Sequence, residues 1–385
     1  MNNLTTSVNK IFNDSLNALT NDSNCSLHDL ISDNLITTVS CNFEMCSDNL
    51  TEFSQVFNTG LKASQNTKNE IKAFISENED IYHRIEAIFQ HSDWSTNYRI
   101  RNFNLATSTT SRAKCTIDSK FYIIKCYDHF YYIYNTESNY CLMAVKNEKK
   151  ALTMINILLL TPYLLYGDLY AVHGGLVSDG KNNILLSNSS LGGKTTFALL
   201  FLEHRWQIIT EETTYITKYG EILNYNIRNY FNIRIGTYLE FKDIFATYGI
   251  INNSFLAMLH KDKEELFELG KKEQMSIYYD DLCKNKESIT TKQITHVLKV
   301  SLEKNKSGLT IEKSRPTENI DRFLELSVGP TVMLFKNLTK MTTMRKNKRK
   351  EELIQIFKDV KSFSVSSGFD YRKNFNFLIK GINTL

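Results

Sequence analysis

The residue types and spacing that could do chemistry are concentrated in one segment, ILLSNSSLGGKTT at positions 184–196. Glycines let successive backbone N–H groups turn inward onto phosphate oxygens. Lys194 can reach the β and γ phosphates of a nucleotide, and the hydroxyl of Thr195 beside it suits Mg²⁺. The segment therefore predicts a phosphate-binding loop. Its predicted lining residues are Asn188, Ser189, Ser190, Leu191, Gly192, Gly193, Lys194, Thr195 and Thr196.

Asn188 stands where the usual pattern of this loop has its first glycine. Asn accepts a left-handed backbone better than other non-glycine residues, which makes the substitution physically admissible. The alternative is an incidental turn, because Gly-Lys-Thr is common on its own. The flanking segments favour the loop, since an apolar strand enters it and an apolar helix opens at Thr195 with its N-terminal dipole towards the phosphates.

Two glutamates, Glu211 and Glu212, follow directly after the next predicted strand at residues 206–210. Carboxylates at the end of a strand beside such a loop can hold Mg²⁺, directly or through water, while one of them accepts a proton from an attacking hydroxyl. The alternative is a solvated acidic turn. The metal-binding and basic roles are favoured because α/β folds place their ligands at this edge of the sheet.

Two further side chains are candidates for the same chemistry. His173 stands in a strand before Gly174 and Gly175, so its ring could contact a phosphate or an acidic residue, or could be a satisfied histidine of the core. Arg234 could neutralise charge on a transferred phosphoryl group, or could pair with a structural carboxylate.

The elements that must position these residues alternate between strands and helix, and we expect an α/β fold, α+β overall. The expected elements are a strand at 170–178, a turn at 179–180, strands at 183–187 and 206–210, a helix at 195–204, hairpins at 213–226 and 295–313, a short helix after Pro316, a helix at 350–360 and a strand and helix within 362–382.

The remaining sequence predicts two earlier regions. Residues 1–95 carry apolar residues at loosely helical spacing and predict a helical or partly flexible leader. Residues 96–168 predict a β-meander, with strands at 120–127, 130–134 and 140–145, followed by a helix at 149–166. The phosphate-binding domain then covers residues 169–385.

Composition excludes several classes of protein. A net charge of +4, from 46 basic and 42 acidic side chains, is too balanced for a nucleic-acid binder. No apolar run approaches the roughly 20 residues of a membrane span. The first thirty residues lack the basic and apolar regions of a secretory signal, so we expect a cytoplasmic protein.

The strings VHGGLV (172–177) and NILLSNSSLGGKTTFALLFLEHRWQIITEE (183–212) resemble the kinase domain of HPr kinase/phosphorylase and its relatives, which include kinases of lasso peptides and other ribosomally made peptides. The resemblance implies a P-loop kinase domain of the HPr kinase/phosphoenolpyruvate carboxykinase-like type. It places Glu211 at the family's catalytic Asp and Glu212 at the adjacent acid. It also matches Arg234 to an arginine of the family. Asn188 and the two glutamates depart from the family pattern of glycine and an Asp pair.

The function expected is that of an ATP-dependent kinase acting on a Ser or Thr hydroxyl of a small protein or ribosomally made peptide. Backbone amides of 191–195 would hold the phosphates of ATP, Lys194 would bridge the β and γ phosphates, Thr195 and Glu212 would bind Mg²⁺, and Glu211 would be the base. The alternatives are a nucleotide-binding recruitment module without transfer chemistry and a small-molecule kinase. Neither nucleic acid nor membrane is an expected partner, and a homo-oligomer is compatible with the sequence.

Overall fold

A computed structural model of the chain divides it into two compact units, Met1–Asp168 with Val328–Arg345, and Leu169–Ser327 with Lys346–Leu385. The structure describes residues 10, 13–14, 26–32, 35–41, 62–63, 71–76, 79–89, 96–101, 110–118, 121–126, 130–135, 140–146, 169–188, 192–211, 213–223, 230–270, 273–282, 293–303, 306–316, 343–368 and 371–384. The helices expected at 149–166 and after Pro316 lie outside these residues.

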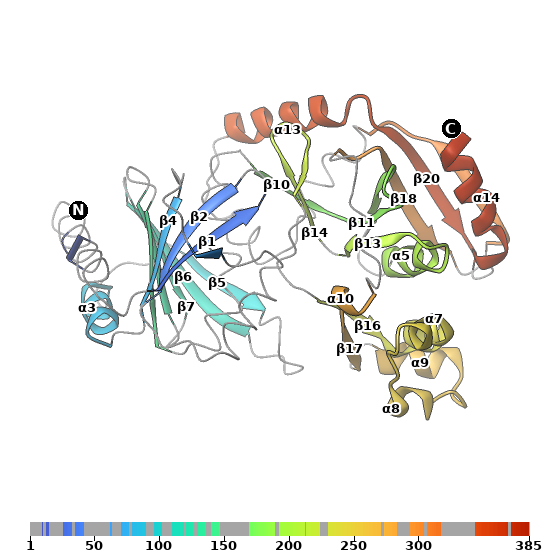
Figure 1. The fold of residues 1–385 in the computed structure, drawn as a ribbon, viewed down its shortest axis with the longest axis horizontal. Helices are drawn as coiled ribbons and strands as arrows, with labels where there is room; N and C mark the ends of the chain where they lie inside the picture. Colours follow the sequence, from blue (N-terminus) through green and yellow to red (C-terminus); the bar gives the residue numbers. More distant parts are fainter. Residues whose placement is uncertain are drawn as a thin grey trace. The chain divides into compact units, whose positions relative to one another are not determined.

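The first unit is built on a nine-stranded sheet in the order β3-β1-β2-β4-β9-β8-β7-β6-β5 (Figure 1). Its strands are β1 Ser26–Ser32, β2 Leu35–Cys41, β3 Lys62–Ala63, β4 Ile71–Ser76, β5 Thr96–Arg101, β6 Thr110–Asp118, β7 Phe121–Cys126, β8 Phe130–Asn135 and β9 Tyr140–Val145. Strands β6 to β9 pair antiparallel in chain order. The runs expected as strands at 120–127, 130–134 and 140–145 are β7, β8 and β9.

The N-terminal region differs from the expected helical leader, because β1 to β4 all belong to this sheet. β4 pairs in parallel with β9, so residues before 95 share a sheet with the meander. The apolar spacing is ambiguous between helix and strand. Ile81 and Ile85 do lie on a helix, α3 Glu79–Phe89, and are buried, whereas Ile71 lies on β4.

The second unit contains a six-stranded mixed sheet, so the α/β class is confirmed. The sheet order is β13-β11-β12-β18-β20-β19. Its strands are β11 Gly175–Ser178, β12 Asn183–Ser187, β13 Gln207–Thr210, β18 His296–Leu302, β19 Leu309–Lys313 and β20 Lys361–Ser367. β12, β18 and β20 run parallel, and β12 and β13 are both antiparallel to β11. The carboxyl ends of four strands therefore meet at one edge.

Helices and a second sheet cover both faces of this sheet (Figure 1). Ile184 and Leu186 of β12 pack in one core with α5 Lys194–Glu203 and α14 Tyr371–Thr384, whereas Leu185 packs in the other with α13 Thr343–Phe357. The second sheet, in the order β10-β14-β15, consists of β10 Leu169–His173, β14 Thr213–Thr217 and β15 Ile222–Leu223. β12 is therefore buried on both faces, which explains its continuous apolar sequence.

Two expectations about these strands are wrong. The strand expected at 170–178 is two strands, β10 and β11, in different sheets. They separate at Gly174, where a Cβ atom would lie 2.8 Å from the backbone oxygen of Leu186, so only glycine allows this close approach. The hairpin expected at 295–313 does not form, because β20 lies between β18 and β19 and pairs with both.

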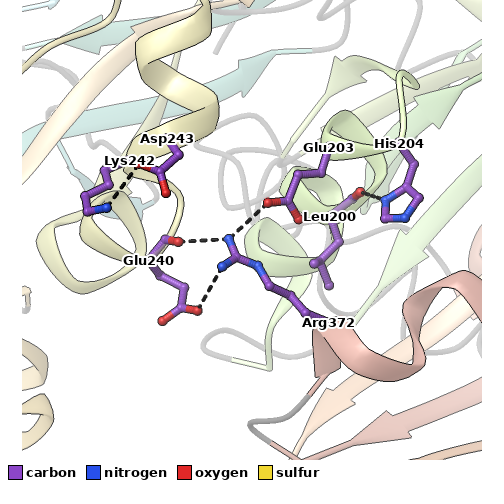
Figure 2. Close-up of polar contacts among 7 residues, drawn as sticks. All are labelled: Leu200, Glu203, His204, Glu240, Lys242, Asp243 and Arg372. Carbon is purple, nitrogen blue, oxygen red and sulfur yellow. Dashed lines mark hydrogen bonds and ion pairs between the residues drawn. The ribbon is translucent and has the colours of Figure 1, made fainter.

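The remaining elements form a lobe of two strands and short helices, which shares a hydrophobic core with α5 and α14 and contacts both helices through Arg372 (Figure 2). The lobe contains β16 Tyr230–Arg234, α6 Ile235–Glu240, α7 Lys242–Thr247, α8 Asn253–Leu256, α9 Lys263–Gly270, β17 Gln274–Tyr278 and α10 Tyr279–Leu282. Arg372 of α14 pairs with Glu203 at 3.1 Å and with Glu240 at 3.6 Å, and donates to the Glu240 carbonyl at 2.8 Å. These side chains are partly exposed, so each ion pair adds modest stability.

A buried histidine, His296, opens β18 at the sheet edge opposite the phosphate-loop segment. Its Nδ1 lies 2.9 Å from the Thr295 hydroxyl. Burial chiefly, and then the charge of Lys361, lower the pKa of His296 from its ordinary value of 6.5, while Asp179 acts in the opposite direction. The unfolded chain therefore takes up this proton more readily than the folded one.

The contribution of the neutral His296 ring to the free energy of unfolding should be fully present above about pH 6.5. It should be lost as the pH falls below that value. We expect His296→Gln to reduce the fall in melting temperature between pH 7.5 and pH 5. Thermal denaturation across this range measures the effect, with His260→Gln, at an exposed position, as the control. The same pH dependence in His296→Gln and the unmodified protein would contradict this account.

Candidate phosphate-binding site

The candidate residues gather where the carboxyl ends of β12 and β13 meet the first turn of α5. Asn188 follows β12, Glu211 follows β13, and His173 ends β10 immediately before β11. β12 and β13 run in the same direction on either side of β11. This topology brings three separate segments of the chain to one sheet edge, where open α/β sheets bind ligands.

Lys194 is the central cation of the site and is 8% exposed. Its Nζ lies 3.1 Å from Nε2 of His173 and donates to the backbone carbonyl of Asn188 at 3.1 Å. A protonated lysine has three donors and no acceptor, so Nε2 of His173 must accept in this pair. A neutral His173 ring then carries its proton on Nδ1. The structure thus brings His173 into contact with Lys194.

Thr195 and Glu211 form the second contact of the site. The Thr195 hydroxyl donates a hydrogen bond to Oε1 of Glu211, whose side chain is buried. A Cβ atom on Gly175 would lie 3.0 Å from the Glu211 carbonyl oxygen, so glycine allows β11 to pass close to this residue. Hydroxyl and carboxylate oxygens are ligands that suit Mg²⁺. Among the described residues, no three His, Cys, Asp or Glu side chains form a group that could hold a metal ion.

The helix after the loop begins with an open N-terminus. Gly193 caps α5 with a left-handed φ of 95°, and no side-chain cap hydrogen bond is made there. Thr196 occupies the third position of the helix. Unsatisfied N–H groups and the dipole at such an end favour an anion. The described part of the loop therefore offers backbone donors beside the buried charge of Lys194.

Asn188 does not replace the glycine of the usual loop pattern through a left-handed backbone. Within the described part of the chain, Arg205 is the one non-glycine residue with positive φ, so Asn188 does not use the left-handed conformation that makes it an admissible substitute for glycine. Its side chain instead makes hydrogen bonds. Nδ2 donates to the Gly192 carbonyl at 2.9 Å and also to the carbonyl of Val300 on β18.

Arg234 lies at the end of β16, and no hydrogen bond or ion pair of the described residues joins it to the Lys194 and Glu211 pairs. Its Nη1 is buried and has no hydrogen-bond partner among the described residues. Of the other candidates, Ser189, Ser190, Leu191 and Glu212 lie outside the described residues.

Val300 and Leu302 of β18 contact the site although no sequence motif marks them. Val300 accepts from Asn188, and Leu302 lies against Gly193, where a Cβ atom would come within 2.7 Å of Leu302 Cγ. The only signal that could have located them is the pairing of β18 with β12, which brings together residues more than a hundred positions apart.

Comparison with models of known protein families and with curated proteins finds no match for the chain. The likeness of residues 171–212 to the HPr kinase/phosphorylase group therefore stays a prediction from sequence. In the part of the chain that the structure describes, no helix is both long enough and apolar enough to cross a membrane.

Proposed function

We propose that the protein is an ATP-dependent kinase of the HPr kinase-like P-loop type, which phosphorylates a Ser or Thr hydroxyl of a small protein or peptide. One observation carries this proposal. Lys194 and Thr195, adjacent in the chain at the start of α5, contact His173 and Glu211 from two other strand ends. A buried lysine, a hydroxyl, a carboxylate and an open helix N-terminus at one sheet edge are the parts that phosphoryl transfer needs.

Lys194 and Glu211 have different roles in the proposed phosphoryl transfer. Lys194 supplies positive charge to the β and γ phosphates, and its bonds to His173 and Asn188 hold its ammonium at the mouth of the loop. The acceptor hydroxyl oxygen attacks the γ phosphorus, the bond from that phosphorus to the β–γ bridging oxygen breaks, and ADP leaves. Glu211 takes the proton of the acceptor hydroxyl.

The oxygens of Thr195 and Glu211 support a place for Mg²⁺ beside the loop, because a hydroxyl and a carboxylate already lie within contact there. The Thr195 hydroxyl, with the carboxylate of Glu212 that follows Glu211 directly in the chain, would hold the ion, and Glu211 would remain the base. When bound, it neutralises phosphate charge. Arg234, whose buried Nη1 has no partner among the described residues, would add positive charge only if the lobe of β16 brings it to the transferred group.

Phosphoryl transfer can be tested before the acceptor is identified. The protein is incubated with ATP labelled in its γ phosphate, Mg²⁺ and a library of Ser- and Thr-containing peptides. We expect label on Ser or Thr side chains of a subset of peptides. Label released only as inorganic phosphate would contradict the kinase, and binding of ATP without any turnover would instead identify a recruitment module.

A further inference from the structure

The side chain of Asn188 links the two ends of the phosphate loop to a neighbouring strand. The residue is 7% exposed. Its Nδ2 donates to the carbonyl of Gly192 at 2.9 Å and to the carbonyl of Val300 on β18. Its own backbone carbonyl accepts from Lys194. One residue therefore contacts the far end of the loop, the adjacent strand and the lysine.

Gly192 lies directly against the side chain of Asn188. A Cβ atom on Gly192 would lie 1.9 Å from Nδ2 of Asn188, and the three nearest heavy atoms all belong to Asn188. Gly192 does not have the left-handed φ that requires glycine, whereas Gly193 does, with a φ of 95°. Gly192 is thus a glycine because Asn188 covers it, and Gly193 is a glycine because of its own backbone.

We infer that Asn188 is a positioning residue that fixes the phosphate loop against β18 before a nucleotide binds. The inference rests on the proposed function only for its consequence, tighter nucleotide binding. A phosphate site whose two ends are already held in place loses less conformational entropy when the phosphates enter. The usual pattern has a small glycine at this position, whereas here the side chain of Asn188 makes two hydrogen bonds. Asn188 therefore supports the loop, and its presence does not weaken the motif.

Restoring the usual glycine should therefore weaken binding. We expect Asn188→Gly and Asn188→Ala to raise the Kd for MgATP about tenfold or more, because the two side-chain hydrogen bonds that hold the site before nucleotide binds are lost and the site must then be ordered on binding. Asn188→Asp should be worse, since its carboxylate faces two carbonyl oxygens. Calorimetry well below the melting temperature separates this effect from general destabilisation. Equal or tighter binding by Asn188→Gly would overturn the inference.

A double-mutant cycle tests the contact with Gly192. Gly192→Ala should lower stability and MgATP affinity strongly in the unmodified protein but much less in Asn188→Ala, where the obstructing side chain is gone. Gly193→Ala is the matched control, because its cost comes from φ and Leu302 and should add to that of Asn188→Ala. Additive effects of Gly192→Ala and Asn188→Ala would contradict the contact.

Amide hydrogen exchange separates this inference from the proposed function. Without nucleotide, Asn188→Ala should exchange faster in peptides covering residues 186–198, while peptides from α14 should stay unchanged. Faster exchange together with no ATP binding by the unmodified protein would support the positioning role and reject the kinase. Unchanged exchange in the loop would reject the positioning role whatever ATP does.

Discussion

Glu211→Gln should lower the rate of phosphoryl transfer by about 10² to 10⁴, the usual span of general acid–base help, while the Kd for ATP changes little. Glutamine matches the size of Glu211 and can still accept the hydrogen bond of the Thr195 hydroxyl, but it cannot take a proton. Rates of labelled phosphate transfer at saturating ATP measure the loss, and calorimetry measures the Kd. Glu312→Gln, on the exposed end of β19, is the control.

Two results would contradict this role of Glu211. A normal rate in Glu211→Gln would show that another group takes the proton. A rate restored by raised Mg²⁺ would show instead that Glu211 holds the metal ion together with Thr195, which its hydroxyl contact also allows. The dependence of the rate on Mg²⁺ concentration in both proteins separates these results.

Lys194→Met should raise the Kd for MgATP by about 10² or more, because charge-assisted hydrogen bonds to phosphate are each worth roughly 1.5 to 3 kcal/mol. Methionine keeps most of the length and apolar character of the buried stem. Calorimetric titration measures the change, and the unliganded melting curve checks that the variant is folded. Lys181→Met, in the exposed turn after β11, is the matched control and should bind ATP normally.

Unchanged MgATP affinity in Lys194→Met would mean that its contacts with His173 and Asn188 are only structural. Loss of affinity in both lysine variants would point to a general effect of charge. We expect a loss of MgATP affinity in Lys194→Met alone.

The local parts of the fold could be predicted from the sequence because their signals are local. The apolar run, the glycines and the apolar helix indicate β12 and α5 to within one residue of their bounds. The order of β18, β20 and β19 could not be predicted, because β20 is separated from β19 by more than forty residues that leave no pairing signal. The break at Gly174 depends on the approach of Leu186, which the sequence does not indicate.

In the site, too, the residues with a local sequence signal could be predicted, whereas those that depend on long-range pairing could not. Lys194 and Thr195 belong to a motif, and Glu211 follows a recognisable strand, so these side chains could be proposed from sequence. The support from Val300 could not, because it lies on a strand 112 residues beyond Asn188. The side-chain contacts of Asn188 could not be predicted for the same reason, because the residue type indicates a backbone preference but not the distant partners of the side chain.

Binding of the phosphates of ATP at this sheet edge is tested most directly by the melting temperature of the unmodified protein with MgATP and with AMP. A ligand that binds only the folded state adds about 2.7 kcal/mol at 100 times its Kd. We expect a clear rise in melting temperature with MgATP and little with AMP, which lacks the β and γ phosphates. An unchanged melting temperature at millimolar MgATP would contradict it.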